Sequence, residues 1–95
     1  MKSGKKISVI IPAYNAESKI EDKLKRLRRM KFIDEVIVVD DGSTDNTAFI
    51  SMKYAHKVIS LKPNHVKGAA MRVGADNARG DIIVFIDSKQ YHAED

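Results

Sequence analysis

Short runs of apolar, mostly β-branched residues alternate with amphipathic stretches along this chain. Each run is followed by a turn that is polar or contains Gly or Pro. Strands that alternate with amphipathic segments are typical of βαβ units, in which both faces of a parallel sheet are buried. The runs predict four strands, over Ile7–Ile11, Glu35–Asp40, Lys57–Leu61 and Ile82–Ile86.

The stretches between these runs predict helices over Ala16–Met30, Thr44–Tyr54 and Lys67–Ala78. In the first stretch Ile20, Leu24 and Leu27 recur at helical spacing and mark an apolar stripe. The small polar side chains of residues 42–45 can cap the second helix, and Gly80 suits a left-handed residue after the third. Because crossovers are right-handed, we predict a three-layer α/β/α, Rossmann-like open parallel sheet of about four strands in the order 3-2-1-4.

The length and composition are those of one globular domain. The chain has 95 residues, of which 43% are hydrophobic and 32% charged. We expect residues 1–6 to be a flexible basic terminus and residues 88–95 to be a loop or tail. The absence of cysteine excludes a disulfide framework, a thiolate zinc site and a thiol nucleophile. No signal peptide or apolar run of about 20 residues is present, so we expect a cytoplasmic protein, with attachment to a membrane surface left open.

Positive charge gathers at the N-terminus and along the first predicted helix. The formal net charge is +4. A solvated helix face explains this pattern, and a surface for anionic lipid or a lipid-phosphate substrate is the alternative. Nucleic acid is disfavoured, because no recognised nucleic-acid-binding module or interleaved aromatic residues accompany the charge.

Polar residues follow three of the predicted strands, in the segments 12–15, 40–43 and 87–89. In an open α/β sheet ligands bind beyond the carboxyl ends of the strands, where the strand order reverses. The adjacent carboxylates Asp40 and Asp41 follow a buried strand and need hydrogen-bond donors, which a nucleobase or ribose could supply. A cap on the next helix is an equally good explanation for one of the two carboxylates.

Two motifs carry a specific resemblance: Ile7-Ser8-Val9-Ile10-Ile11-Pro12-Ala13-Tyr14-Asn15, and Val38-Val39-Asp40-Asp41-Gly42-Ser43-Thr44-Asp45-Asn46-Thr47. Together they resemble the opening of family 2 glycosyltransferases, of the GT-A fold. The likeness continues through Lys67-Gly68-Ala69-Ala70 and Ala78-Arg79-Gly80-Asp81 to Asp87, so it covers nearly the whole chain. Within the family, the chain looks most like the dolichyl- and polyprenyl-phosphate mannose and glucose synthases, because residues 87–95 resemble their Asp-Ala-Asp-Leu-Gln-His stretch, with His92 in register.

This resemblance implies the nucleotide-binding half of a GT-A enzyme and a set of site residues. Asp40 would hold the base, Asp87 would also bind a metal ion, and none of the residues would be catalytic. The implied nucleotide-binding residues are Pro12, Ala13, Tyr14, Glu17, Asp40, Asp41, Lys67, Arg72 and Asp87.

The chain departs from the family pattern around the expected metal. The family implies Mg²⁺ or Mn²⁺, which favour oxygen ligands. Here Lys89 stands where a second carboxylate is expected, and Tyr91 where the synthases have Gln. Val66 replaces the Gly that usually precedes Lys67-Gly68. These substitutions predict weak dependence on a metal ion.

Three functions remain open at this level. The chain could serve inverting transfer from a UDP- or GDP-sugar to an acceptor such as a polyprenyl phosphate. It could be a short or truncated, non-catalytic nucleotide-binding module, or a basic interaction protein. We expect no transfer by these 95 residues alone, because the family's acceptor site and base lie in a following half.

The last predicted strand raises the question of assembly. Residues 82–86 contain no charge or Pro, so as a sheet edge they would invite pairing with another strand. Either residues 89–95 cover this edge, or a second copy pairs with it in a two-fold homodimer.

Overall fold

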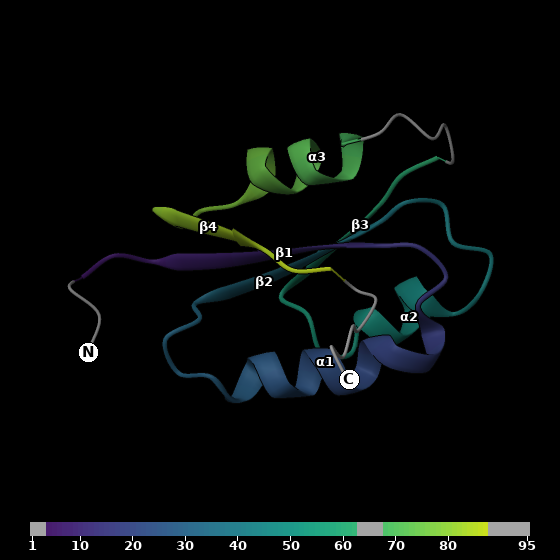
Figure 1. Cartoon of the computed structure of the whole chain (residues 1–95), viewed down its shortest axis with the longest axis horizontal. Coiled ribbons are helices and arrows are strands. Elements are labelled where there is room, and N and C mark those ends of the chain that lie inside the picture. The colour runs from purple at the N-terminus through teal and green to yellow at the C-terminus, as the bar shows by residue number, and fades with distance from the viewer. Residues whose placement is uncertain (1–3, 63–67, 88–95) are drawn as a thin grey trace.

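The computed structural model describes residues 4–62 and 68–87. Four parallel strands form one sheet in the order β3-β2-β1-β4, which confirms the predicted topology (Figure 1). The elements along the chain are β1 Ile7–Ala13, α1 Glu17–Arg29, β2 Glu35–Asp40, α2 Thr47–Ser51, β3 Lys57–Ser60, α3 Ala69–Asn77 and β4 Ile82–Phe85.

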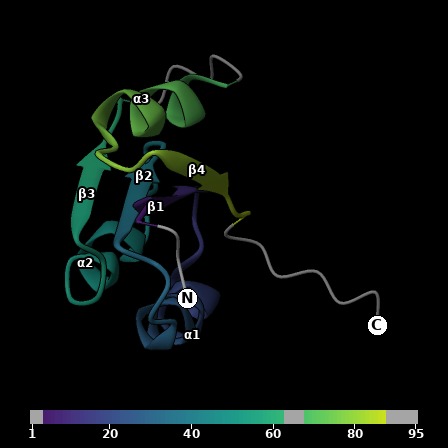
Figure 2. The same ribbon diagram turned by 90° about the vertical axis from the view of Figure 1, so that its left-hand side faces the viewer.

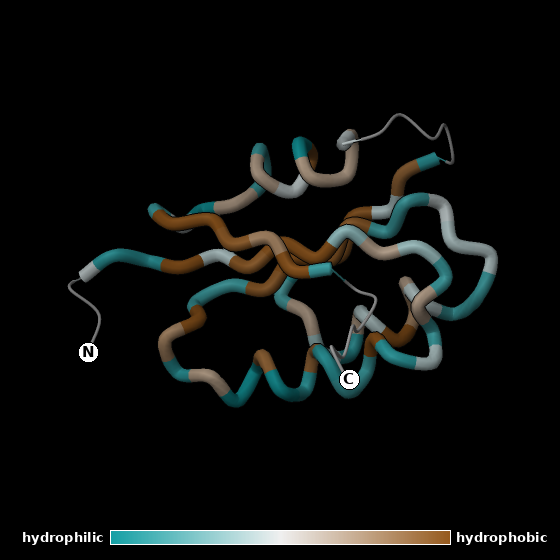
Figure 3. The backbone as a smooth tube through the Cα atoms, viewed as in Figure 1, coloured by the Kyte–Doolittle hydropathy of each residue, from teal (hydrophilic) through white to brown (hydrophobic). Residues whose placement is uncertain are grey.

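The helices form two layers, with α1 and α2 on one face of the sheet and α3 on the other (Figures 1 and 2). Side chains of β1 alternate between the two faces. Val9 and Ile11 pack in the same cluster as Leu24 of α1, whereas Ile10 packs in a second cluster with Ala70 of α3. The sheet is the most hydrophobic layer (Figure 3). These two cores confirm the predicted three-layer architecture.

β1 is two residues longer than predicted and includes Pro12 and Ala13. The Ile10 carbonyl accepts a hydrogen bond from the Ile86 N–H, so the backbone polar groups of Ile10 face the β4 side of the strand. Pro12 lies two residues further along β1, so its backbone faces the same side, but β4 has already ended at Phe85. The missing N–H of Pro12 therefore costs no bond between strands, and the proline is tolerated inside a central strand.

Gly80 does not adopt the left-handed conformation predicted for it. The positive φ angles among the described glycines belong to Gly4, Gly42 and Gly68. An added Cβ at Gly80 would lie 2.5 Å from Ser8 Oγ and 2.8 Å from Ser8 N. Gly80 is therefore required by close contact with β1, and not by the geometry of a helix end.

The sheet ends in an exposed strand. The side chains of Ile82, Ile83, Val84 and Phe85 in β4 are 43%, 37%, 39% and 43% exposed. Among the described residues, β4 pairs only with β1. None of the helices in this part of the chain is long and apolar enough to cross a membrane.

Candidate functional site

The carboxyl ends of β1 and β2 lie side by side, with Ala13 paired in register with Asp40. Ala13 and Asp40 are nearly fully buried, at 2% and 5% exposure. Asp40 Oδ1 accepts a hydrogen bond from the Ser43 N–H, at 3.2 Å. Tyr14, the next residue after β1, is 46% exposed. A buried carboxylate and an exposed aromatic residue thus lie at the neighbouring carboxyl ends of β2 and β1.

Asp41 holds the one unsatisfied buried side-chain atom found in the described part of the chain. Its backbone N–H donates to the Ala13 carbonyl at 2.8 Å, which extends the pairing of β2 with β1. Its Oδ1 atom is buried and has no hydrogen-bond partner. Leaving a buried acceptor unpaired costs about 1–3 kcal/mol, and more when the group is charged. Because this oxygen has almost no exposed surface, a ligand could donate to it and recover this cost only after the surrounding loops rearrange.

The loops after β1 and β2 are joined by reciprocal hydrogen bonds. The Asn15 N–H donates to Ser43 Oγ at 2.8 Å, and the Thr44 N–H donates to Asn15 Oδ1 at 2.9 Å. Asn15 adopts a left-handed conformation, with φ of 48°, and Gly42 has φ of 79°. Asn tolerates this region better than most residues, and Gly adopts it freely. These two residues let the loops after β1 and β2 turn sharply, so that the two loops face each other.

A second set of bonds joins the beginnings of α1 and α2. Asp45 Oδ2 accepts from the Glu17 N–H at 3.2 Å, and Asp45 Oδ1 accepts from the Thr47 N–H at 3.0 Å. Burial raises the pKa of Asp45, but the hydrogen bonds from Thr47 and Glu17 outweigh this and hold the pKa below its usual value. Thr47 Oγ1 in turn accepts from the Ala16 N–H at 2.8 Å. We call Asn15, Ser43, Thr44, Asp45 and Thr47 the loop lock.

The loop lock corrects the predicted role of residues 42–45. They were expected to cap a helix beginning at Thr44, but α2 begins at Thr47. Ser43 and Thr44 bond instead to Asn15 in the loop before α1, whereas Asp45 accepts from the N–H groups of both Glu17 in α1 and Thr47 in α2. The motif itself carried the signal for capping, but it could not show that Asp45 also accepts from the first N–H of α1.

The other predicted site residues lie around this edge. The carboxylate of Glu17 accepts hydrogen bonds from the backbone and side-chain nitrogens of Asn46, at 3.4 and 3.3 Å. Arg72 is exposed in the first turn of α3, and Asp87 is exposed just after β4. Pro12 is half-buried within β1.

Lys23 of α1 interacts electrostatically with Asp87. Burial lowers the pKa of Lys23, and the negative charge of Asp87 partly opposes that effect. A group of three His, Asp or Glu residues that could hold a metal ion does not occur within residues 4–62 and 68–87. In this part of the chain the predicted metal site is therefore represented by Asp87 alone. Lys67, Lys89, Tyr91 and His92 lie outside the described residues.

A second polar region lies at the opposite edge of the sheet, where the strands begin. It forms a pocket of about 350 Å³ that sequence reasoning did not find, lined by Lys6, Ser8, Asp34, Glu35, His56, Arg79 and Gly80. Glu35 Oε1 accepts from Ser8 Oγ at 2.7 Å and from the Arg79 N–H at 2.9 Å. Ser8 Oγ also accepts from the Gly80 N–H at 2.8 Å. The signal in the sequence was Ser8, a polar residue inside an apolar run.

An open parallel sheet with carboxylates at the carboxyl ends of its strands is typical of nucleotide-binding α/β domains. The sequence profile of glycosyl transferase family 2 matches residues 8–95, and the chain belongs to this family. The mouse dolichyl-phosphate beta-glucosyltransferase is 37% identical over 100 residues, which span 88% of this chain and 31% of that protein. The poly(ribitol-phosphate) beta-N-acetylglucosaminyltransferase TarS of Staphylococcus aureus is 38% identical over 95 residues, spanning 90% of this chain and 16% of TarS.

Solved structures agree with this assignment. Glucosyl-3-phosphoglycerate synthase from Mycobacterium tuberculosis in complex with UDP superposes with a TM-score of 0.81 at 34% identity. The match covers 95% of this chain and 36% of that one. A complex of the same enzyme with Mn²⁺, UDP-glucose and phosphoglyceric acid gives a TM-score of 0.79 at 35% identity. The chain spans about a third of the length of this synthase and of the mouse relative.

Proposed function

We propose that this chain binds the nucleotide of a UDP- or GDP-sugar at the carboxyl ends of β1 and β2. The observation that carries the proposal is the buried, unpaired Asp41 Oδ1 beside Asp40, in loops held by the loop lock. The UDP complexes of the mycobacterial synthase support it, because they share this fold. The two carboxylates would accept hydrogen bonds from nucleobase N–H and ribose hydroxyl groups.

The proposed reaction is inverting transfer of the sugar to an acceptor, for which a polyprenyl phosphate is the best candidate. The likeness to a dolichyl-phosphate glucosyltransferase supports this acceptor class. In this reaction the described residues would bind the nucleotide-sugar, through Asp40, Asp41 and Tyr14. Arg72 and Lys67 would lie near the base or the diphosphate, and near the diphosphate a positive charge is favourable.

Titration calorimetry with UDP and GDP tests the nucleotide site. Asp40→Asn should weaken binding by about tenfold, because a charge-assisted hydrogen bond to the ligand is lost. Asp76→Asn is the matched control, since Asp76 is exposed on α3 and should leave the affinity unchanged. Equal affinities for the wild type and both variants would contradict the proposal.

We propose further that a divalent cation adds little to this binding, although the mycobacterial synthase is seen with Mn²⁺ and Mg²⁺. Lys89 supplies a positive charge where the family pattern has a carboxylate ligand, and it can partly replace a metal ion near a diphosphate. Nucleotide affinity should be similar in chelator and in excess manganese, and Lys89→Asp should make it depend on manganese. A large gain with manganese in the wild type would contradict this.

Finally, we propose that two copies pair through β4, which is apolar and exposed on the edge of the sheet. The pairing would be antiparallel and two-fold symmetric. Sedimentation equilibrium should show dimers that Val84→Lys dissociates, because a charge on an edge strand opposes pairing. A strict monomer at high concentration would contradict this, and would indicate instead that residues 89–95 cover the edge.

A further inference from the structure

The whole net charge of the chain lies on one segment, consisting of α1 and the two residues that follow it. Residues 17–31 contain seven Lys or Arg and three acidic residues, a net charge of +4, which equals that of the full chain. The remaining residues contain ten basic and ten acidic side chains. Such segregation creates a directional positive field on one side of the molecule.

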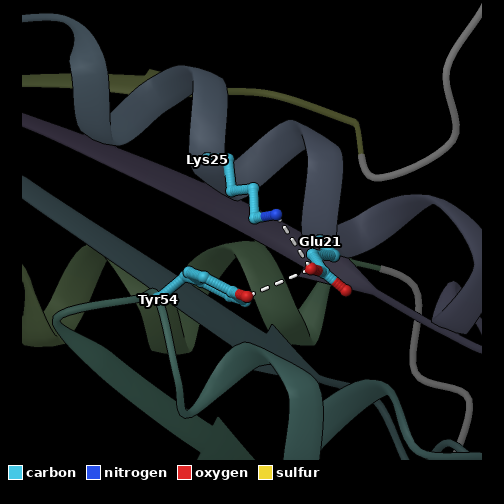
Figure 4. A network of polar contacts seen from close by, with 3 residues as sticks. All are labelled: Glu21, Lys25 and Tyr54. Atoms are coloured by element: carbon cyan, nitrogen blue, oxygen red, sulfur yellow. Dashed lines mark hydrogen bonds and ion pairs between the residues drawn. The ribbon is translucent and has the colours of Figure 1, made fainter.

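Some of these cations are engaged within the fold. Lys25 forms an ion pair with Glu21 at 3.1 Å, and Tyr54 donates a hydrogen bond to the same carboxylate at 3.0 Å (Figure 4). Arg28 donates to the backbone carbonyl of Tyr54. Both contacts hold α1 against the segment that follows α2. Lys23 interacts with Asp87, as described above.

Four other cations have no such role. The side chains of Lys19, Arg26, Arg29 and Lys31 are exposed, and none forms a hydrogen bond or ion pair with another described residue. The inward stripe of α1 consists of Ile20, Leu24 and Leu27. With 3.6 residues per turn, Arg26 and Arg29 therefore lie on the outer side of the helix.

Two large apolar side chains are exposed among these cations. Met30 is 40% exposed and Phe32 is 54% exposed, on either side of Lys31. They follow the last turn of α1, so basic and apolar side chains alternate over residues 29–32. We call Arg26, Arg29, Met30, Lys31 and Phe32 the basic-apolar surface.

We propose that the basic-apolar surface docks on an anionic phospholipid bilayer. The cations would be attracted to acidic headgroups, and Phe32 and Met30 would enter the boundary between headgroups and acyl chains. Nucleic acid would satisfy the cations, but its phosphate backbone offers nothing to Met30. The combination of charge and exposed apolar groups therefore favours lipid.

The position of this surface is compatible with nucleotide binding. α1 begins at the loop lock and runs back along the sheet, so its last turn lies at the opposite end from Asp40 and Asp41 (Figure 1). Docking through this end would leave the nucleotide site open. Lipid binding and nucleotide binding should therefore be separable by mutation.

Vesicle flotation of the full chain tests the proposal, using phosphatidylcholine alone and phosphatidylcholine mixed with phosphatidylglycerol. The wild type should float only with the anionic vesicles, and added salt should weaken the binding. Each basic residue near an anionic surface contributes roughly a fivefold factor, so the triple variant R26Q/R29Q/K31Q should bind roughly a hundredfold more weakly. The control K5Q/K6Q/K62Q removes the same charge from elsewhere and should change binding much less.

The variant Phe32→Ser separates docking from simple charge attraction. It should lower vesicle binding severalfold without altering the net charge, and circular dichroism should show that the fold is kept. Equal losses in the two triple variants, or no loss in R26Q/R29Q/K31Q, would overturn the proposal. Binding to a DNA oligonucleotide but not to anionic vesicles would also overturn it, and would assign the surface to nucleic acid.

Discussion

Acidic side chains lie at both ends of the strands, which we call the amino edge, where the strands begin, and the carboxyl edge, where they end. The hydrogen bonding of these side chains differs between the two. At the amino edge Asp34 accepts from the Ile7 N–H at 2.8 Å, Asp81 accepts from the Lys6 N–H at 2.9 Å, and Glu35 accepts two bonds. At the carboxyl edge Asp41 Oδ1 is buried without a partner. The satisfied carboxylates hold strands and connections together. The unsatisfied one has a cost that a ligand can offset, which is why we place the nucleotide site at the carboxyl edge.

The largest predicted effect is a loss of stability from a substitution at the amino edge. Gly80→Ala would place a Cβ 2.5 Å from Ser8 Oγ, 2.8 Å from Ser8 N and 3.0 Å from the Lys6 carbonyl, and backbone atoms cannot move aside cheaply. We expect a loss of about 3 kcal/mol in the free energy of unfolding, measured by urea denaturation. Gly68→Ala is the control: nothing lies within 4 Å of its added Cβ, so it should suffer only the cost of a φ of 85°, about 1–2 kcal/mol. Similar losses in both variants would show that contact with Ser8 is unimportant.

The next largest effect concerns the loop lock. Asp45→Ala removes the acceptor shared by the Glu17 and Thr47 N–H groups and should cost about 2 kcal/mol of stability. Because the folded pKa of Asp45 is lowered, its contribution is present above the usual value of 3.8 and is lost as the pH falls through the lower folded value. Urea denaturation should be followed from about pH 5 to about pH 2, the range in which Asp titrates. The free energy of unfolding of Asp45→Asn should depend less on pH than that of the wild type. Parallel curves for the two proteins would count against this role.

Asp41→Asn should separate stability from binding. The side chain makes no hydrogen bond through Oδ1, so its replacement should leave the free energy of unfolding nearly unchanged or raise it. Nucleotide affinity should fall by about tenfold, as expected when a charge-assisted bond is lost. Glu35→Gln at the amino edge should do the reverse, with lower stability and unchanged affinity. A stability loss in Asp41→Asn equal to that in Glu35→Gln would remove the distinction between the edges.

The smallest effect is the titration of His56 at the amino edge. His56 Nδ1 accepts a hydrogen bond from the Val36 N–H at 2.9 Å, and burial together with the charge of Arg28 lowers its pKa. Stability should therefore be complete above the usual pKa of 6.5 and should decline as the pH falls through the lower folded value. His56→Gln keeps an acceptor without a charge change near neutrality. Its stability should vary less than that of the wild type across this range, and identical slopes would contradict the assignment.

The strand order could be predicted because it depends on local pattern, whereas the position of the site stays a prediction. Apolar runs define buried strands, and right-handed crossovers then leave few arrangements. The roles of Gly80 and Asp45 could not be predicted, because both depend on contacts with β1 or the loop after it, far away in sequence. For the same reason the composition of residues 42–45 correctly indicated a cap on the second helix, which Asp45 supplies to the Thr47 N–H, but did not show that Asp45 also binds the Glu17 N–H of α1.

We propose that the nucleotide binds at the carboxyl ends of the strands and not in the pocket at their amino ends. Chemical-shift mapping of the labelled chain with UDP and then GDP tests this directly, because the two edges have different amides. We predict perturbations at Ala13, Tyr14, Asp41 and Gly42, with Glu35, His56 and Gly80 unchanged. Perturbations confined to Glu35, His56 and Gly80, or no perturbation at either edge with both nucleotides, would contradict the claim.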